Sequence, residues 1–224
     1  MNIGERVKKI LNEVPNYLKV VAATKGRSTE EINEAIESGI NFIGENYLQE
    51  AESKYKLIKK DVKWHFIGHL QKNKVKKVVR LFDMIETLDS LDLAEIINKE
   101  CSKIGKVMPV LIEINSAGEL QKSGVLFEDL QKIVEGLLNF KYIKVKGLMT
   151  MGPVVKDVEE IRPFFIKTKE AFEKIKSLYK NDLQWEELSM GMSDTYRIAI
   201  EEGATIVRIG RAIFEDNYEN KDSF

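Results

Sequence analysis

The chain has 224 residues, of which 43% are hydrophobic and 32% charged, and 35 Lys and Arg face 36 Asp and Glu. This composition predicts a folded protein with its own core, and it excludes a disordered chain or bulk electrostatic binding of nucleic acid. One cysteine and two histidines exclude a disulfide framework and the usual zinc cages. No apolar run approaches the roughly 20 residues of a membrane span, so we expect a soluble, cytoplasmic protein.

Hydrophobic periodicity predicts a helix over residues 2–13, followed by regular alternation of strands and helices. The expected strands are 18–24, 42–43, 63–67, 84–87, 107–114, 143–149, 184–188 and 205–209. The expected helices are 29–38, 47–59, 71–79, 91–104, 127–138, 157–179 and 194–202. Eight such units without Pro-, Gly- or Ser-rich linkers predict one domain over 1–224, a closed (β/α)8 barrel of the TIM type. The last helix must be short, so the extra N-terminal helix is expected to cover part of the barrel wall.

The alternative fold is an open Rossmann-like sheet. That fold requires a glycine-rich fingerprint after the first strand, and the segment Thr-Lys-Gly-Arg at 24–27 is not one. The sequence therefore favours the barrel, in which the active site lies at the C-terminal ends of the strands.

Lys25 is the first candidate functional residue, because it follows an apolar strand at this end of the barrel. Its side chain has the same parity as Val21 and Ala23, which places it at the barrel mouth if those two face inward. A lysine among apolar neighbours and other cations loses its proton more easily, and the neutral amine attacks a carbonyl group to form a Schiff base. The alternative is a solvated lysine at a strand end, which position alone favours.

Small residues follow the seventh and eighth expected strands, at 189–194 and 210–212. Loops in these two places form the recurrent phosphate site of such barrels, because small residues let backbone N–H groups approach an anion. Ser193 or Asp194 can also cap a helix whose positive end faces the anion. Either loop alone would be explained by a tight turn, but the two together favour a phosphate site.

Further polar residues lie at other strand ends. Arg208 is flanked by apolar residues of the eighth strand, and its permanent charge needs either a ligand acceptor or an acidic partner from elsewhere in the chain. Asn46 follows the second strand, where its amide would bind a ligand or cap the next helix. His65 and His69 end the third strand, and without a third ligand nearby a packing or hydrogen-bonding role is favoured over a metal.

Three other features suggest little chemistry. The basic run 71–80 is interpreted as a solvated helix face, since it has no interleaved aromatic residues. Cys101 has no basic neighbour in sequence and is interpreted as an unreactive thiol. The segment Lys122-Ser123-Gly124 after the fifth strand is a weak candidate for a loop that touches a ligand at the rim.

Six motifs at the expected strand ends together resemble the pyridoxal phosphate homeostasis proteins. They are VAATK at 21–25, FIGEN at 42–46, WHFIGHLQ at 64–71, GLM at 147–149, LSMGMSD at 188–194 and VRIG at 207–210. The resemblance extends from about residue 20 to 216, and six ordered motifs are far more specific than any one of them. It implies a barrel like the N-terminal domain of alanine racemase.

The resemblance also implies a set of cofactor-binding residues. It implies pyridoxal 5′-phosphate (PLP) held as a Schiff base on Lys25, with Arg208 near the pyridine nitrogen and Asn46 lining the same pocket. The residues implied at the phosphate are Ser189, Met190, Gly191, Gly210 and Arg211. We expect the lysine and the phosphate loops at opposite sides of the barrel mouth.

One position departs from the family pattern, and another has a chemical consequence. Arg211 stands where the family usually has a small hydroxyl residue or alanine, so a side-chain hydroxyl to the phosphate is lost while the backbone N–H remains. Arg208 does not give up its proton, so an arginine at the pyridine nitrogen favours an unprotonated ring and weakens the cofactor as an electron sink.

Three functions are compatible with these residues. The first is a PLP-binding protein that buffers the cofactor or delivers it to PLP-dependent apoenzymes, with no robust catalysis of its own. The second is a PLP-dependent amino-acid racemase, which needs acid/base groups on both faces of its substrate; alanine racemases obtain one with the help of a C-terminal β domain that this sequence does not show. The third is a Schiff-base aldolase acting on a phosphorylated sugar. We expect the first function, in a monomer without metal, nucleic acid or membrane.

Overall fold

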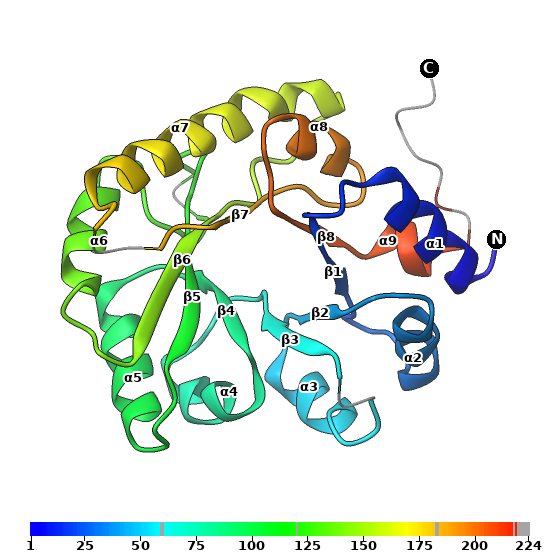
Figure 1. Cartoon of the computed structure of the whole chain (residues 1–224), viewed down its shortest axis with the longest axis horizontal. Helices are drawn as coiled ribbons and strands as arrows, with labels where there is room; N and C mark the ends of the chain where they lie inside the picture. Colours follow the sequence, from blue (N-terminus) through cyan, green and yellow to red (C-terminus); the bar gives the residue numbers. More distant parts are fainter. Residues whose placement is uncertain (59–60, 120, 182–183, 217, 219–224) are drawn as a thin grey trace.

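The structure is a computed structural model of the chain that describes residues 1–58, 61–119, 121–181, 184–216 and 218. Within these residues, eight parallel strands form a closed barrel in sequence order (Figure 1). They are β1 Lys19–Ala23, β2 Phe42–Glu45, β3 Lys63–Phe66, β4 Met84–Leu88, β5 Met108–Glu113, β6 Ile143–Met149, β7 Glu187–Ser189 and β8 Ile206–Ile209. The (β/α)8 fold predicted from the sequence is confirmed.

Helices surround the barrel in Figure 1. They are α1 Ile3–Glu13, α2 Thr29–Glu37, α3 Leu48–Lys54, α4 Val75–Leu81, α5 Leu91–Ser102, α6 Leu130–Leu137, α7 Arg162–Leu178, α8 Tyr196–Glu201 and α9 Arg211–Phe214, with 3-10 turns η1 Lys72–Lys74 and η2 Val158–Ile161. No helix in the described part of the chain is long and apolar enough to cross a membrane.

The N-terminal helix covers the part of the wall beside the short last helix, as predicted. Helix α1 packs against both α2 and α9, and Figure 1 shows the three together. The buried Arg6 side chain fixes this arrangement by donating from Nε to the carbonyl of Ile213 at 2.7 Å. Asn2 and Glu5 form a capping box that starts the helix.

Several predicted boundaries differ from the structure. The helix expected over 47–59 ends at Lys54 and continues as turns, and its predicted last residue, Lys59, lies outside the described residues. The seventh strand begins at Glu187, not at Gln184. Strand and helix ends depend on backbone hydrogen bonds with neighbouring elements, which periodicity does not reveal.

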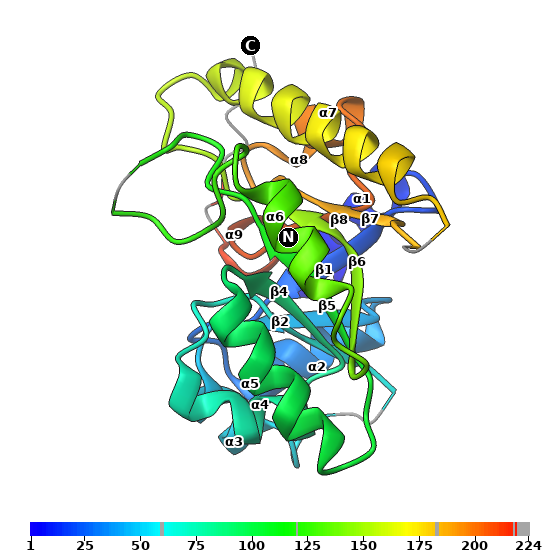
Figure 2. The same ribbon diagram turned by 90° about the vertical axis from the view of Figure 1, so that its left-hand side faces the viewer.

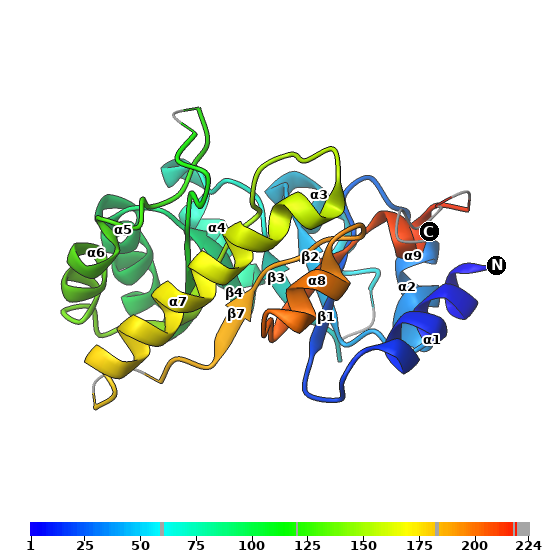
Figure 3. The ribbon, with the colours of Figure 1, turned by 90° about the horizontal axis from the view of Figure 1, so that it is seen from above.

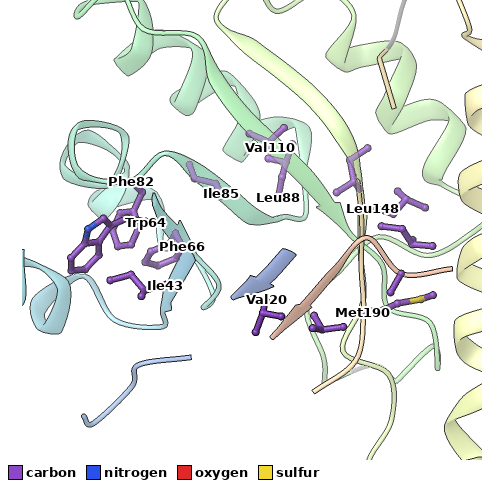
Figure 4. Close-up of a cluster of buried hydrophobic side chains, with 14 of the residues drawn as sticks. Val20, Ile43, Trp64, Phe66, Phe82, Ile85, Leu88, Val110, Leu148 and Met190 are labelled. Atoms are coloured by element: carbon purple, nitrogen blue, oxygen red, sulfur yellow. The ribbon is translucent and has the colours of Figure 1, made fainter. Parts of the chain in front are cut away.

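The core has two layers. The larger lies between the barrel and the helices, where Trp64, Phe66 and Phe82 pack edge to face between β3 and α4 (Figure 4). The smaller fills the barrel itself and contains Val21, Met84, Leu111, Met149 and Ile206. Val21 therefore faces the barrel interior, which is the orientation that the predicted position of Lys25 at the mouth requires.

Loops project from the C-terminal end of the barrel. The loop after β5, described at 114–119 and 121–129, and the loop after β6, residues 150–157, extend on the same side of the molecule (Figures 2 and 3). These loops enclose the side chains that lie above the smaller core layer inside the barrel. This end of the barrel therefore holds the candidate site.

Candidate functional site

The C-terminal ends of the strands surround a cavity of about 770 Å³. Each of the eight strands, or the loop that follows it, contributes to the lining. The polar and charged lining residues are Asn46, His69, Thr87, Glu113, Asn115, Ser116, Lys122, Ser123, Lys156, Ser193, Asp194, Thr195, Arg208 and Arg211. A cavity of this size with a few convergent polar groups is typical of a small-molecule site.

A buried polar network forms the floor of the cavity. Arg208 donates from Nη1 to the Ser189 hydroxyl at 2.5 Å and from Nη2 to the carbonyl of Thr150 at 2.9 Å. The Ser189 hydroxyl donates to Glu86 at 2.7 Å, and His65 Nδ1 lies 2.6 Å from the other Glu86 oxygen. Arg208 has a carboxylate partner in Glu86, which confirms the acidic partner that the sequence left open. It also lines the cavity, and its contact with a ligand stays a prediction.

The pKa of Glu86 is lowered although the residue is fully buried. Burial opposes ionisation, but the hydrogen bond and charge of His65, the charge of Arg208 and the hydrogen bond from Ser189 outweigh it and lower the pKa of Glu86. A buried charge persists where such partners surround it. His65 thus has the hydrogen-bonding role that the sequence favoured, and the described residues contain no cluster of three or more potential metal ligands.

Glu113 is a site residue that sequence reasoning missed. Its side chain is 4% exposed and lines the cavity, and no described residue donates a hydrogen bond to its carboxyl group. Burial, and secondarily the charge of Asp89, raise its pKa to about 7 against the opposing effect of Arg208. Glu113 lies two residues after the inward-facing Leu111 on the same strand, and this spacing is the sequence signal that its side chain also faces the barrel interior.

Lys25 lies in a turn directly after β1, and its side chain is exposed. Its Nζ lies 5.3 Å from the centre of the Tyr47 ring, and Ala23, not Lys25, lines the cavity. The alternation of inward and outward side chains predicted along the first strand ends at Ala23, because the chain turns there. In this turn the Arg27 N–H bonds to the Thr24 carbonyl at 3.1 Å, and Gly26 has a φ of 69°. Lys25 is therefore at the mouth but outside the cavity wall.

The residues of the first predicted phosphate loop divide between two environments. Ser189 belongs to the floor network, Met190 is buried in the outer core, and neither lines the cavity. Gly191 has a φ of 91°, and a Cβ there would lie 2.5 Å from Ala199. The chain needs glycine at this turn, and the loop reaches the cavity only at residues 192–195.

Ser193 joins the two predicted phosphate loops. Its hydroxyl accepts the N–H groups of Gly210 at 3.3 Å and Ala212 at 3.2 Å. Gly210 and Arg211 both line the cavity, and the Arg211 guanidinium bonds to Asp194 at 2.6 Å. The loops after β7 and β8 are thus linked by hydrogen bonds into one wall.

The relative position predicted for Lys25 and these loops was wrong. Strand β1 pairs with β8 in the closed barrel, with Val21 opposite Arg208, so the loops that follow them are neighbours. A Cβ on Gly210 would lie 3.4 Å from Ala23. The closed barrel predicted from the sequence already makes the first and eighth strands neighbours, so the expectation of opposite sides was inconsistent with the predicted fold.

The remaining rim residues come from three loops. Asn46 lines the cavity and is not a helix cap, because Tyr47 is the residue before α3. Lys122 bonds to Glu119 at 2.6 Å, and the Ser123 hydroxyl lies 3.2 Å from His69 Nδ1. The weak prediction that Lys122 and Ser123 form a rim loop agrees with their position.

Residues 2–217 match the family model described as alanine racemase, N-terminal domain. In agreement, the chain aligns with alanine racemase of Clostridium difficile at a TM-score of 0.81, over 100% of this chain and 61% of that one, although only 16% of residues are identical. This likeness concerns the fold alone. Fold and site together define an alanine-racemase-like barrel.

Proteins with higher sequence identity to the chain identify its family within this class. The pyridoxal phosphate homeostasis protein of Aquifex aeolicus is 40% identical over 96% of this chain and 98% of its own. PipY of Synechococcus elongatus, solved with PLP bound, is 29% identical with a TM-score of 0.89, over 95% of this chain and 100% of that one. The chain belongs to the family of pyridoxal phosphate homeostasis proteins.

Proposed function

We propose that the protein binds PLP at the barrel mouth and buffers it or delivers it to PLP-dependent apoenzymes, without robust catalysis of its own. The observation that carries this proposal is one cavity lined by the buried Arg208 guanidinium and by the wall formed by the loops after β7 and β8. The Lys25 turn follows β1, the strand that pairs with β8, at the mouth of this cavity. We also propose that the protein is a monomer and lies in the cytoplasm.

The residues fit the cofactor by chemical type. Arg208 has five N–H donors, and its described hydrogen bonds go to only two acceptors, so donors remain for the pyridine nitrogen. The backbone N–H groups of Ser193 and Arg211 are suited to the phosphate, whereas those of Thr195 and Gly210 already donate to the Met192 carbonyl and the Ser193 hydroxyl. Asn46 would contact the ring. Ser189, Met190 and Gly191 would act indirectly, by orienting Arg208 and shaping the loop. When bound, PLP supplies an aldehyde that condenses with primary amines, and Lys25 offers an exposed amine on the turn after β1, the strand that pairs with β8.

The family relationship supports the same conclusion, since the relatives are named for PLP homeostasis and the PipY structure contains PLP. A racemase is less well supported. In the alanine racemases the second acid/base group is a tyrosine, and no tyrosine lines the cavity among the described residues. Lys25 is also exposed to water, which favours side reactions over controlled amino-acid chemistry.

The proposal is tested by loading the protein with PLP, removing free cofactor and adding an apo-aminotransferase. We expect the aminotransferase to become active, and the loaded protein alone to leave amino acids unchanged. Steady amino-acid turnover at ordinary enzyme rates, about 1–1,000 per second, would identify an enzyme instead. Cleavage of a phosphorylated sugar by colourless protein would identify an aldolase.

A further inference from the structure

A buried lysine lies beneath the turn that carries Lys25. Lys54, the last residue of α3, is 8% exposed, and its ammonium group donates to three oxygens. They belong to the Thr24 carbonyl at 2.9 Å, the Glu45 carboxylate at 2.7 Å and the Glu50 carboxylate at 2.9 Å. All three donors of the ammonium are used, so Lys54 is held in one position.

The same carboxylates also bind the turn directly. The Thr24 hydroxyl donates to Glu45 at 2.7 Å, and the Gly26 N–H donates to Glu50 at 2.8 Å. Lys54, Glu45 and Glu50, which we call the Lys54 cluster, thereby fix the residues on both sides of Lys25. The Lys25 side chain itself is left exposed beside Tyr47.

The Lys54 cluster holds the turn at a cost in folding free energy. Glu45 is fully buried, and one of its carboxylate oxygens has no hydrogen-bond partner among the described residues. Burial raises the pKa of Glu45 despite the bonds from Lys54 and Thr24. Buried charged groups with incomplete partners reduce stability, and proteins keep them where function requires them.

Charge gives the cluster a chemical consequence. Burial opposes ionisation of Glu50, but the Gly26 N–H and the charges of Lys54 and Lys25 outweigh it and lower the pKa of Glu50. Glu50 is therefore a carboxylate within the electrostatic range of Lys25. A nearby carboxylate stabilises the ammonium form of a lysine, and that form does not attack a carbonyl.

The other charged groups around the turn have partners of their own. Arg27 pairs with Glu31 at 3.7 Å and with Glu215 at 3.1 Å. The Tyr47 ring faces Lys25 from the start of α3, and Glu45 lies below, bonded to Lys54. Glu50 is thus the acidic group whose effect on Lys25 depends most directly on Lys54.

We propose that Lys54 is a positioning residue for Lys25: it fixes the turn that carries Lys25 and pairs with the Glu50 carboxylate, so that Glu50 does not act on Lys25 alone. This inference rests on the proposed function, in which Lys25 is the amine that binds the aldehyde of the cofactor. Lys54 itself does not touch the cofactor.

The test measures how readily Lys25 loses its proton in protein free of PLP. Trace acetic anhydride reacts with unprotonated amines, and mass spectrometry of the Lys25 peptide gives the rate of acetylation against pH. For Lys54→Met we expect the midpoint of this profile to rise by about half a pH unit, because Glu50 then acts on Lys25 alone. For Glu50→Gln we expect it to fall, and the double variant to match Glu50→Gln.

Two further variants separate this effect from a general loss of structure. Lys54→Arg keeps the charge, and we expect it to restore most of the wild-type midpoint. Lys77→Met removes an exposed ion pair with Glu52 on the outer surface of α3 and α4, and we expect no shift. Should Lys54→Met fail to fold, Glu50→Gln still tests the proposal, since its carboxylate is partly exposed.

Unchanged midpoints in both Lys54→Met and Glu50→Gln would overturn the inference, as would an equal shift in Lys77→Met. The labelling reaction does not involve PLP, so its outcome is separate from that of the proposed function. If PLP binds to Lys25 and the midpoints do not move, this inference alone fails. If the midpoints move and PLP does not bind, the electrostatic role of Lys54 stands and the proposed function fails.

Discussion

The Arg208 guanidinium and the Glu86 carboxylate lie 3.7 Å apart inside the barrel, and the Ser189 hydroxyl bonds to both. The floor of the cavity therefore contains a balanced pair of charges. Arg208→Glu would remove the partner of Glu86, which costs about 3–5 kcal/mol of stability, and would add repulsion between two carboxylates in the core. A neutral variant is needed to examine the role of Arg208 in binding.

We expect Arg208→Gln to bind PLP about 10- to 150-fold more weakly, because a charge-assisted hydrogen bond worth about 1.5–3 kcal/mol is lost. The pH titration of the cofactor absorbance should change as well, since the charge at the pyridine nitrogen differs. The measurement is a spectroscopic titration of both proteins with PLP at several pH values.

Arg211→Gln is the matched control for this experiment. Its side chain is 52% exposed and bonded to Asp194, so we expect a change in affinity of only a few-fold. If Arg208→Gln alters neither affinity nor spectrum, Arg208 serves only as the structural partner of Glu86.

Ser193→Ala tests the phosphate wall. Without its hydroxyl the N–H groups of Gly210 and Ala212 lose their common acceptor, and the loops after β7 and β8 lose a direct link. We expect affinity for PLP to fall about 10-fold, and affinity for pyridoxal, which has no phosphate, to stay the same. Equal losses for the two ligands would place the phosphate elsewhere.

Glu113 should make stability depend on pH. Its pKa rises from 4.5 to about 7 on folding, so the folded protein holds the proton more tightly than the unfolded chain. The stability contributed by neutral Glu113 is fully present below about pH 4.5, falls as the pH rises and is lost above about pH 7. The loss is about 3 kcal/mol, from the relation between pKa shift and free energy.

Denaturant unfolding between pH 4.5 and 8 measures this dependence. Glu113→Gln is neutral throughout, so we expect its stability to decline less over this range than that of the wild type. Glu95→Gln, a change at an exposed glutamate, should retain the wild-type decline. An identical decline in Glu113→Gln and the wild type would show that Glu113 is not the group responsible.

The sequence predicted the barrel because its strands are apolar runs separated by helices, a local pattern. It also placed Asn46, Arg208 and Gly210 at the cavity, since each ends a strand or begins the next loop. These inferences need only the order of elements and the rule that sites lie at the C-terminal ends of strands.

The remaining features depend on contacts that are distant in sequence. The side-chain direction of Lys25 could not be predicted because its chain turns after Ala23, and the role of Ser189 depends on Glu86 from β4. Lys54 resembled an ordinary helix lysine, since its partner Glu45 belongs to another element. Such roles emerge only when the strands and helices are brought together.

We predict above all that PLP is bound covalently through Lys25. The most direct measurement is the absorbance spectrum of the purified, PLP-loaded protein before and after borohydride reduction, followed by peptide mapping. We predict a yellow protein that loses its colour on reduction and carries a pyridoxyl group on Lys25, while Lys25→Ala carries none. A pyridoxyl group on Lys122 or another lysine of the wild type, or no covalent group at all, would contradict the claim.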